Sequence, residues 1–188
     1  VLDDAIQTSQ AMIVSEDGFH FNNWDKKKVL PTVHDEEVGE PKMRDPKVWK
    51  DGDSYYMMMG SSYHDAGRVL FYTSKDGENW TYANQCRPES YGWTIECPDL
   101  FSQNDQWIFI GCPMRLTPGE KKYPDQAVWA LAEFDPKTCE LKLPDTHSYV
   151  DYGLDLYAPQ TTLDAEGRRV MILSLIHISE PTRRVVIS

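Results

Sequence analysis

A repeated turn segment constrains the fold of this chain more than any other feature. The segment Ser15–Phe21 aligns with Ser74–Trp80, which places Asp17 and Asp76 59 residues apart, and the same step leads on to a third polar turn at Asp135. An apolar run precedes each of the three turns. The chain is therefore built from successive copies of one structural unit, whose length is given by this spacing.

A second repeated element lies between the copies of the first. Asp45-Pro46, Cys97-Pro98 and Ala158-Pro159 are each followed by a short apolar or β-prone run and then by a polar turn. These turns are residues 50–53, 102–105 and 164–167, and they contain the Gly, Asn and Asp residues that tolerate tight hairpins. Each period thus holds about four short strands, which predicts a β-propeller whose blades pack around one axis.

The strand pattern supports an all-β fold. Ser54–Gly60 and Trp107–Gly111 are short, rich in aromatic or β-branched residues, and bounded by turn residues. No stretch keeps the apolar spacing of an amphipathic helix over a full helix length. A parallel α/β fold needs long crossover connections, and none is visible.

Composition limits the partners of this chain. The formal net charge of −11 over 188 residues argues against nucleic acid or an anionic membrane as partner. A small neutral substrate fits better, and the oligomeric state stays open. The cysteines Cys86, Cys97, Cys112 and Cys139 lack the spacing of a zinc site, so we expect free thiols, no metal, no cofactor and a cytoplasmic location.

The two ends of the sequence depart from the repeat pattern. The segment before Asp17 reads as the outer strands of a blade whose inner strands are missing. The blade pattern stops near Leu173, and the run from Ser174 to Arg183 resembles the translation of a sequencing adapter. We therefore expect a partial propeller domain at residues 1–173 and a tail at 174–188 that is an artefact unrelated to the domain.

Two acids lie where the repeat predicts a shared site. Asp45 and Glu96 stand at the start of innermost strands, which point toward the central funnel of a propeller, so they converge although they are far apart in sequence. A pair of carboxylates is the minimal apparatus for glycoside hydrolysis, because one group protonates the leaving oxygen while another stabilises the positive centre. Without the repeat, each acid would be read simply as a turn or cap residue.

Three motifs then resemble a known family. Arg44-Asp45-Pro46, Glu96-Cys97-Pro98-Asp99 and the segment Asp151–Gln160 are similar to motifs of glycoside hydrolase family 32, which includes invertases, sucrose-6-phosphate hydrolases, levanases and inulinases. The resemblance covers about residues 8 to 173. It implies a five-bladed propeller, of which this chain holds the end of the first blade to the fourth, and a C-terminal β-sandwich that is missing here.

The resemblance also implies roles for individual residues. Glu96 corresponds to the general acid/base, and Asp45 to the stabiliser of the transition state that grips the fructosyl hydroxyls. Asp45 has to stay ionised for this role, and Arg44 would help to hold its charge. The substrate-contacting residues implied by the resemblance are Arg44, Cys97, Asp155 and Tyr157.

One departure from the family pattern affects activity. The family's nucleophile is an aspartate in a Trp-x-Asn-Asp-Pro-Asn-Gly motif, and no such stretch occurs in these 188 residues. The resemblance implies cleavage of terminal β-fructofuranosidic bonds by a retaining double displacement. We expect this polypeptide alone to be inactive, since the covalent intermediate cannot form without the nucleophile.

Several alternatives stay open from the sequence. The substrate is sucrose, sucrose 6-phosphate or a fructan, and a phosphate would require a cation near the funnel rim, for which Lys42, Arg68 and Arg115 are candidates. Another five-bladed carbohydrate-active hydrolase, of the arabinan type, is a second reading. A non-catalytic sugar-binding propeller is a third, which would bind a fructoside without cleaving it.

Overall fold

The regular structure of this protein consists of β-strands. The computed structural model describes residues 8–30, 43–116, 125–153 and 156–175. Within these ranges the one element that is not a strand is the 3-10 turn η1 at Asn23–Asp25. No helix in this part of the chain is long and apolar enough to cross a membrane. The all-β class predicted from the sequence is confirmed.

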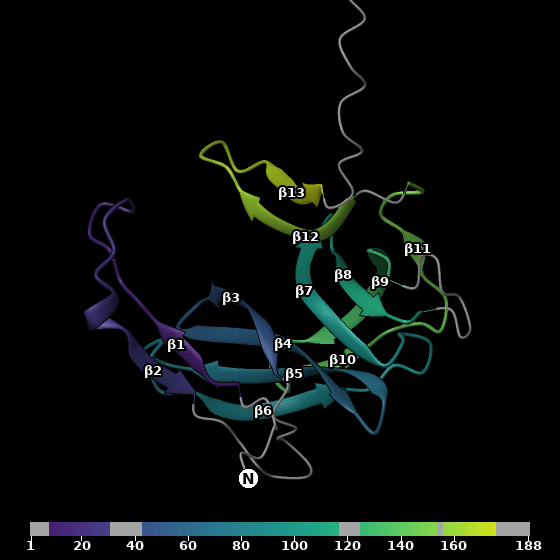
Figure 1. Cartoon of the computed structure of the whole chain (residues 1–188), viewed down its shortest axis with the longest axis horizontal. Coiled ribbons are helices and arrows are strands. Elements are labelled where there is room, and N and C mark those ends of the chain that lie inside the picture. Colours follow the sequence, from purple (N-terminus) through teal and green to yellow (C-terminus); the bar gives the residue numbers. More distant parts are fainter. Residues whose placement is uncertain (1–7, 31–42, 117–124, 154–155, 176–188) are drawn as a thin grey trace, which may run out of the picture.

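The strands form four antiparallel groups that follow the order of the sequence (Figure 1). The hairpin β1–β2 comes first, the sheet β3–β4–β5–β6 second, the sheet β7–β8–β9–β10 third, with β11 paired to β9, and the hairpin β12–β13 last. The bounds are β1 Gln10–Met12, β2 Lys27–Leu30, β3 Arg44–Asp51, β4 Ser54–Tyr63, β5 Ala66–Ser74, β6 Thr81–Cys86, β7 Thr94–Gln103, β8 Gln106–Met114, β9 Val128–Asp135, β10 Glu140–Lys142, β11 Ser148–Tyr149, β12 Leu156–Leu163 and β13 Arg169–Leu175.

Both sets of repeated turns fall at equivalent places in these groups. Asp17 lies between β1 and β2, Asp76 between β5 and β6, and Asp135 at the end of β9 before β10. The second set of turns joins β3 to β4, β7 to β8 and β12 to β13. The first hairpin is therefore the outer half of one blade, and the last hairpin is the inner half of another, as the repeat predicts.

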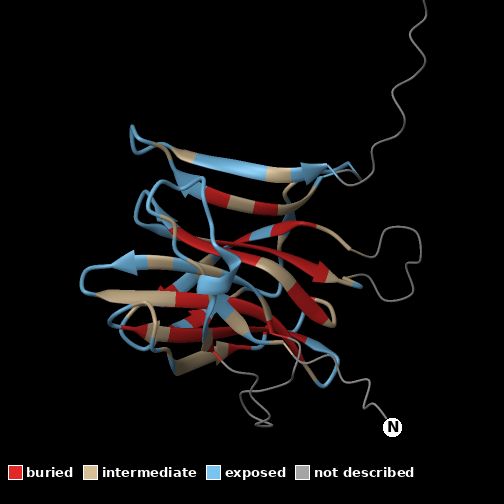
Figure 2. Ribbon diagram, turned by 60° about the vertical axis from the view of Figure 1, so that its left-hand side comes forward, coloured by how far each residue is buried: buried red, intermediate tan, exposed pale blue. Residues whose placement is uncertain are grey.

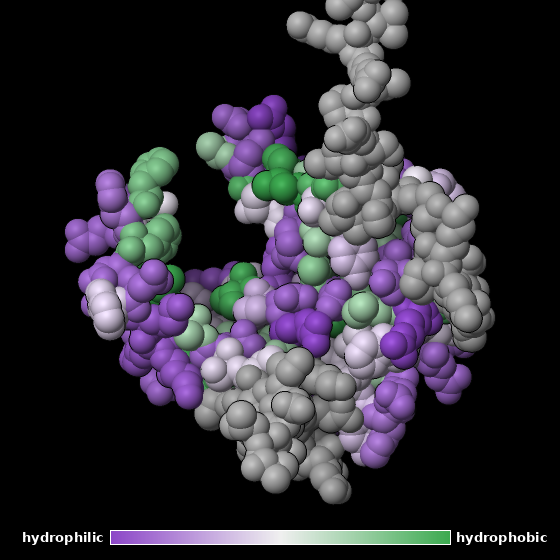
Figure 3. Space-filling model, in the orientation of Figure 1, coloured by the Kyte–Doolittle hydropathy of each residue, from purple (hydrophilic) through white to green (hydrophobic). Residues whose placement is uncertain are grey.

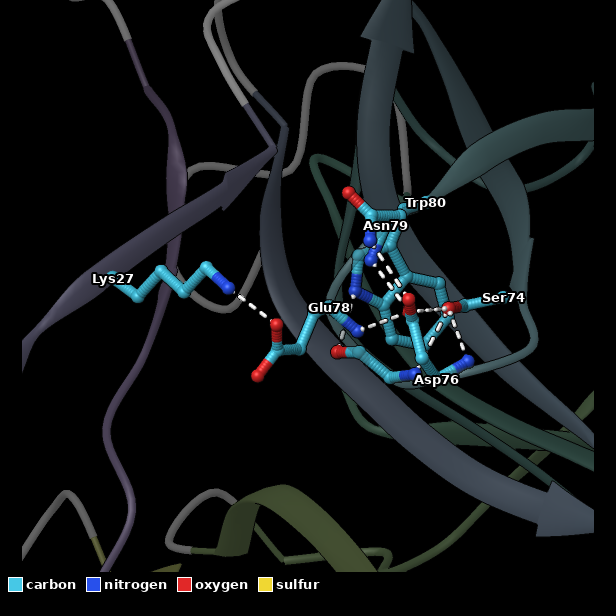
Figure 4. Close-up of polar contacts among 7 residues, drawn as sticks. Lys27, Ser74, Asp76, Glu78, Asn79 and Trp80 are labelled. Carbon is cyan, nitrogen blue, oxygen red and sulfur yellow. Dashed lines mark hydrogen bonds and ion pairs between the residues drawn. The ribbon is translucent and has the colours of Figure 1, made fainter.

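Hydrogen bonds within the turn explain why it repeats an aspartate (Figure 4). One oxygen of Asp76 accepts the backbone N–H groups of Glu78, at 2.9 Å, and Asn79, at 2.8 Å. Hydrogen bonds led by that from the backbone N–H of Asn79 lower the pKa of the Asp76 carboxyl below its usual value. Asp17 accepts the equivalent two N–H groups, of residues 19 and 20. Lys27 pairs with Glu78 and so joins β2 to the turn between β5 and β6.

Two apolar clusters hold the groups together. The buried residues concentrate on strands of the second and third sheets (Figure 2). Met58 and Phe71, from the second sheet, pack with Phe109 and Phe134, from the third, and the Phe71 and Phe134 rings lie 5.3 Å apart. On the other face of the second sheet, Leu30, Met43, Met57, Met59, Leu70 and Tyr72 form the cluster that packs toward β2. The second sheet is thus covered on both faces, as an internal propeller blade must be.

A glycine sets the distance between the second and third sheets. Gly60 of β4 faces the backbone of β7, and a Cβ at this position would stand only 2.0 Å from the carbonyl oxygen of Ile95. The two strands can approach this closely only because position 60 has no side chain. Since Ile95 directly precedes Glu96, this contact helps to fix the position of Glu96 relative to the second sheet.

The groups curve around a hollow that opens between the β1–β2 and β12–β13 hairpins (Figure 3). The strands β3, β7 and β12 lie on its inner side, and all but two of the residues of β13 are exposed. This succession of blades confirms the predicted partial β-propeller. Strand β13 ends at Leu175, and residues 176–188 lie outside the described part of the chain, so the expected domain boundary after residue 173 stays a prediction.

Candidate active site

The three inner strands share the same interruption near their first residues. Asp45, Cys97 and Ala158 adopt positive φ angles of 57°, 47° and 53°, and each precedes a proline. The pairing register shifts at each of these points, which marks a β-bulge in β3, β7 and β12. A left-handed conformation is strained for residues other than glycine, and such strain persists where the surrounding structure imposes it.

The residue just before each bulge points into one shared cluster. Arg44, Glu96 and Tyr157 hold this position on β3, β7 and β12. The guanidinium Nη1 of Arg44 lies 2.6 Å from Oε1 of Glu96, and the Tyr157 hydroxyl donates to Oε2 at 3.1 Å. Three blades thus supply the acid and its two hydrogen-bond donors from equivalent positions.

Glu96 is held in a mostly buried setting. Its side chain is 18% exposed, and both of its oxygens are already oriented by Arg44 and Tyr157. Burial raises the pKa of the Tyr157 phenol well above its ordinary value, so the hydroxyl keeps its proton and always acts as the donor. A carboxyl group fixed in this way can give or take a proton at a defined point in the funnel.

Asp45 of β3 contacts the bulge of β7, at the residue that follows Glu96. Its Oδ2 accepts the backbone N–H of Cys97 at 2.9 Å and faces the Cys97 sulfur at 3.6 Å. Asp45 is exposed, and among the described residues its second oxygen has no hydrogen-bond partner. One oxygen therefore anchors the side chain, while the other is available to a ligand.

Cys97 connects the two acids, because it follows Glu96 in β7 and contacts Asp45. A hydrogen bond with Cys112, followed by burial and by the charge of Asp45, raises the pKa of the Cys97 thiol far above its usual range. The thiol stays protonated and donates to Asp45. Because the thiolate is the nucleophilic form, Cys97 serves here as a small donor and spacer.

A second layer of contacts lies farther along the same three strands. Asp99 is fully buried, and its Oδ2 pairs with the ammonium of Lys47 at 3.1 Å and accepts the N–H of Thr161 at 2.6 Å. Lys47 also donates to the Thr161 carbonyl at 2.5 Å. The side-chain amide of Gln160 donates to the Cys97 carbonyl at 3.1 Å. These contacts tie β3, β7 and β12 together directly behind the bulges.

The structure brings together most of the residues singled out from the sequence. Asp45, Glu96, Arg44, Cys97 and Tyr157 form one cluster. Asp155 lies outside the described residues. The sequence analysis missed Lys47 and Gln160 and gave Asp99 no role. The repeat could have identified them, because each stands three positions after a residue of the cluster. In the described part of the chain, no group of three acidic, His or Cys side chains could hold a metal ion.

A family model matches most of this chain. The model of the N-terminal domain of glycosyl hydrolase family 32 matches residues 2–185. The sucrose-6-phosphate hydrolase of Salmonella typhimurium is 36% identical over 139 residues, which cover 69% of this chain and 30% of that protein. The sucrose-6-phosphate hydrolase of Escherichia coli is 32% identical over 176 residues, covering 90% of this chain and 35% of that protein.

Solved structures show the same fold. A Bombyx mori β-fructofuranosidase of this family, solved as a mutant in complex with sucrose, is 31% identical and superposes with a TM-score of 0.70 over 92% of this chain and 40% of that one. The sucrose-6-phosphate hydrolase of Lactobacillus gasseri, at 21% identity, gives a TM-score of 0.74 over 91% of this chain and 36% of that one. The chain therefore spans about a third of the length of these proteins.

Proposed function

This chain belongs to glycosyl hydrolase family 32, and we propose that the full-length protein hydrolyses terminal β-fructofuranosidic bonds by a retaining double displacement. The observation that carries the proposal is the cluster in which Glu96 accepts hydrogen bonds from Arg44 and Tyr157 beside the anchored carboxylate of Asp45. Glu96 and Asp45 are the two acids for which the sequence predicts a shared site.

Glu96 acts as the general acid/base in this proposal. The leaving-group oxygen takes a proton from Glu96 in the first step, and the resulting carboxylate removes a proton from water in the second. Arg44 stabilises the carboxylate form between the two steps, because its guanidinium lies 2.6 Å from the carboxyl oxygen. Tyr157 fixes the rotation of the carboxyl group through its hydroxyl.

Asp45 acts as the stabiliser of the sugar ring. Its anchored oxygen holds the side chain in place, so the exposed oxygen can accept hydrogen bonds from ring hydroxyls as positive charge develops at the anomeric carbon. Sucrose and sucrose 6-phosphate are the substrates suggested by the sucrose complex of the Bombyx mori enzyme and by the names of the bacterial relatives. Fructans are a further candidate.

The nucleophile of this mechanism is not among the residues of this chain that match the family's motifs. The aspartate motif in which the family carries it does not occur among the 188 residues. The isolated chain can therefore position the acid and the stabiliser but cannot form the fructosyl intermediate. Hydrolysis is a property that we assign to the full-length protein alone.

Replacing Glu96 in the full-length protein tests the proposal. We expect Glu96→Gln and Asp45→Asn each to lower kcat for sucrose or sucrose 6-phosphate by at least about 100-fold, because each substitution removes one essential proton or charge. Glu140→Gln, which alters an exposed carboxylate on β10, serves as the matched control and should keep normal turnover. Turnover by the Glu96→Gln protein near the wild-type rate would refute the assignment.

The same assay separates the competing functions. A full-length protein that cleaves arabinosides instead of fructosides would be an arabinan-type hydrolase. One that binds a fructoside, measured by calorimetry, without cleaving it would be a sugar-binding propeller. Each result would leave the fold intact and overturn the proposed reaction.

A further inference from the structure

Arg115 occupies the rim of the blade that carries Glu96. It follows the last residue of β8 and has a φ of 54°. Its backbone N–H donates to Asp125 at 3.0 Å, and its guanidinium carbon lies 5.1 Å from the centre of the Trp93 ring. The aspartate thus holds the turn, while the tryptophan supports the side chain from one face.

The strand register places this pair next to the candidate acid. Glu96 pairs with Cys112 across β7 and β8, so Trp93 and Arg115 each stand three residues farther along their strands, on the side away from Asp99. Three residues of a strand span about 10 Å. Within the proposed function, we assign the leaving group to this side of Glu96, next to Trp93 and Arg115.

Within the described ranges, the guanidinium of Arg115 is not used in an ion pair. Asp125 accepts the backbone N–H of Arg115 instead. Arg44 pairs with Glu96, and Arg68, another candidate from the sequence, is completely buried. Arg115 is also exposed, as a contact to an incoming substrate requires. Lys42, the third candidate from the sequence, lies outside the described residues.

We propose that Arg115, supported by Trp93, binds a phosphate group on the leaving sugar, so that the substrate is a phosphorylated sucrose-type fructoside. This inference rests on the proposed function for the direction in which the leaving sugar lies. A guanidinium suits the role because its planar donors match phosphate oxygens two at a time. A neutral hexose would not require a cation at this place, whereas a phosphate dianion near so many acidic residues would.

The test compares two substrates in the full-length protein. We expect Arg115→Gln to lower the ratio of kcat/KM for sucrose 6-phosphate to kcat/KM for sucrose about 10- to 100-fold, the loss associated with one charge-assisted contact. Arg115→Lys should recover part of the ratio, because it keeps the charge but not the planar fork. Arg87→Gln is the matched control. Arg87 is an exposed arginine stacked on Tyr63 at 3.8 Å, and its replacement should leave the ratio unchanged.

A binding measurement separates this inference from the proposed reaction. By calorimetry, the wild-type protein should bind glucose 6-phosphate at least about 10-fold more tightly than glucose, and Arg115→Gln should abolish the difference. If neither disaccharide is cleaved but this binding difference depends on Arg115, the phosphate site stands and the proposed function fails. If Arg115→Gln reduces both kcat/KM values equally, or if the wild type shows no preference for phosphate, the phosphate site is overturned.

Discussion

Asp99 is the residue on which the three inner strands converge. It is fully buried, its Oδ2 contacts both Lys47 of β3 and the backbone of Thr161 in β12, and its own strand carries Glu96. Buried ion pairs contribute little net stability over an apolar pair, but removing one partner leaves an uncompensated charge. The position is therefore intolerant of single substitutions.

For the Asp99→Asn protein we expect a loss of about 3 kcal/mol in the free energy of unfolding, because Lys47 keeps its charge in a mostly buried site. Urea denaturation of the full-length protein measures this loss. The Lys47→Met, Asp99→Leu double variant should regain a large part of it, since no unpaired charge remains.

A surface ion pair provides the control for Asp99. Lys142 lies 3.8 Å from Glu133 and 3.7 Å from Glu140, and all three side chains are exposed. Lys142→Met should cost less than about 1 kcal/mol. Equal losses for Asp99→Asn and Lys142→Met would show that the buried pair does not hold the inner strands together.

At the residue scale, the sequence predicted the cluster but not its connections. Asp45 and Glu96 were recognisable because the proline-containing bulges repeat, and the structure places the two side chains on adjacent blades. The pair formed by Lys47 and Asp99 was not predicted, because a contact between two blades depends on how far each strand slides past its neighbour. That displacement is set by packing and leaves no local pattern in the sequence.

At the scale of the element, two predicted strands end too early, each at a glycine. The strands predicted at Ser54–Gly60 and Trp107–Gly111 exist, but β4 continues to Tyr63 and β8 to Met114. Gly60 and Gly111 lie inside these strands, where a neighbouring backbone or the Phe109 ring approaches too closely for a Cβ. A glycine that permits close packing looks the same in a sequence as one that ends a strand.

Replacing Gly60 by alanine tests this close approach. The new Cβ would lie 2.0 Å from the Ile95 carbonyl oxygen, so β7 has to move away from β4 just before Glu96. We expect a loss of about 2 kcal/mol in the free energy of unfolding and a fall in kcat of at least about 10-fold, because the acid is displaced. Thermal unfolding and steady-state kinetics of the full-length protein measure the two effects.

Gly18 offers a control for the Gly60 substitution. It has a φ of 76° in the turn between β1 and β2, and nothing lies within 4 Å of the position of a Cβ. Asparagine tolerates such a conformation, so Gly18→Asn should change stability by less than about 1 kcal/mol and leave kcat unaltered. Normal kinetics in the Gly60→Ala protein would mean that β7 tolerates the displacement and that Glu96 is positioned by other contacts.

At the scale of the whole molecule, the described residues include exposed apolar surfaces of the kind that a closed propeller covers. The last hairpin, β12–β13, packs on β7 and β8 through one side alone, and in the described residues no further strand pairs with β13. The exposed apolar side chains of this hairpin are Leu156, Leu163, Val170, Met171, Ile172 and Leu175. An unpaired strand edge beside such a surface is a site of self-association, which the net charge of −11 opposes.

We expect the isolated 188-residue polypeptide to associate at micromolar concentration, because pairing through β13 removes the exposed edge from water. Size-exclusion chromatography with light scattering measures the mass of the species. Ile172→Lys, placed at the most exposed apolar residue of the hairpin, should shift the distribution toward the monomer, since a charge at this edge opposes pairing. A monomeric wild-type chain with one cooperative unfolding transition would show instead that the two complete blades and two hairpins are stable without further blades.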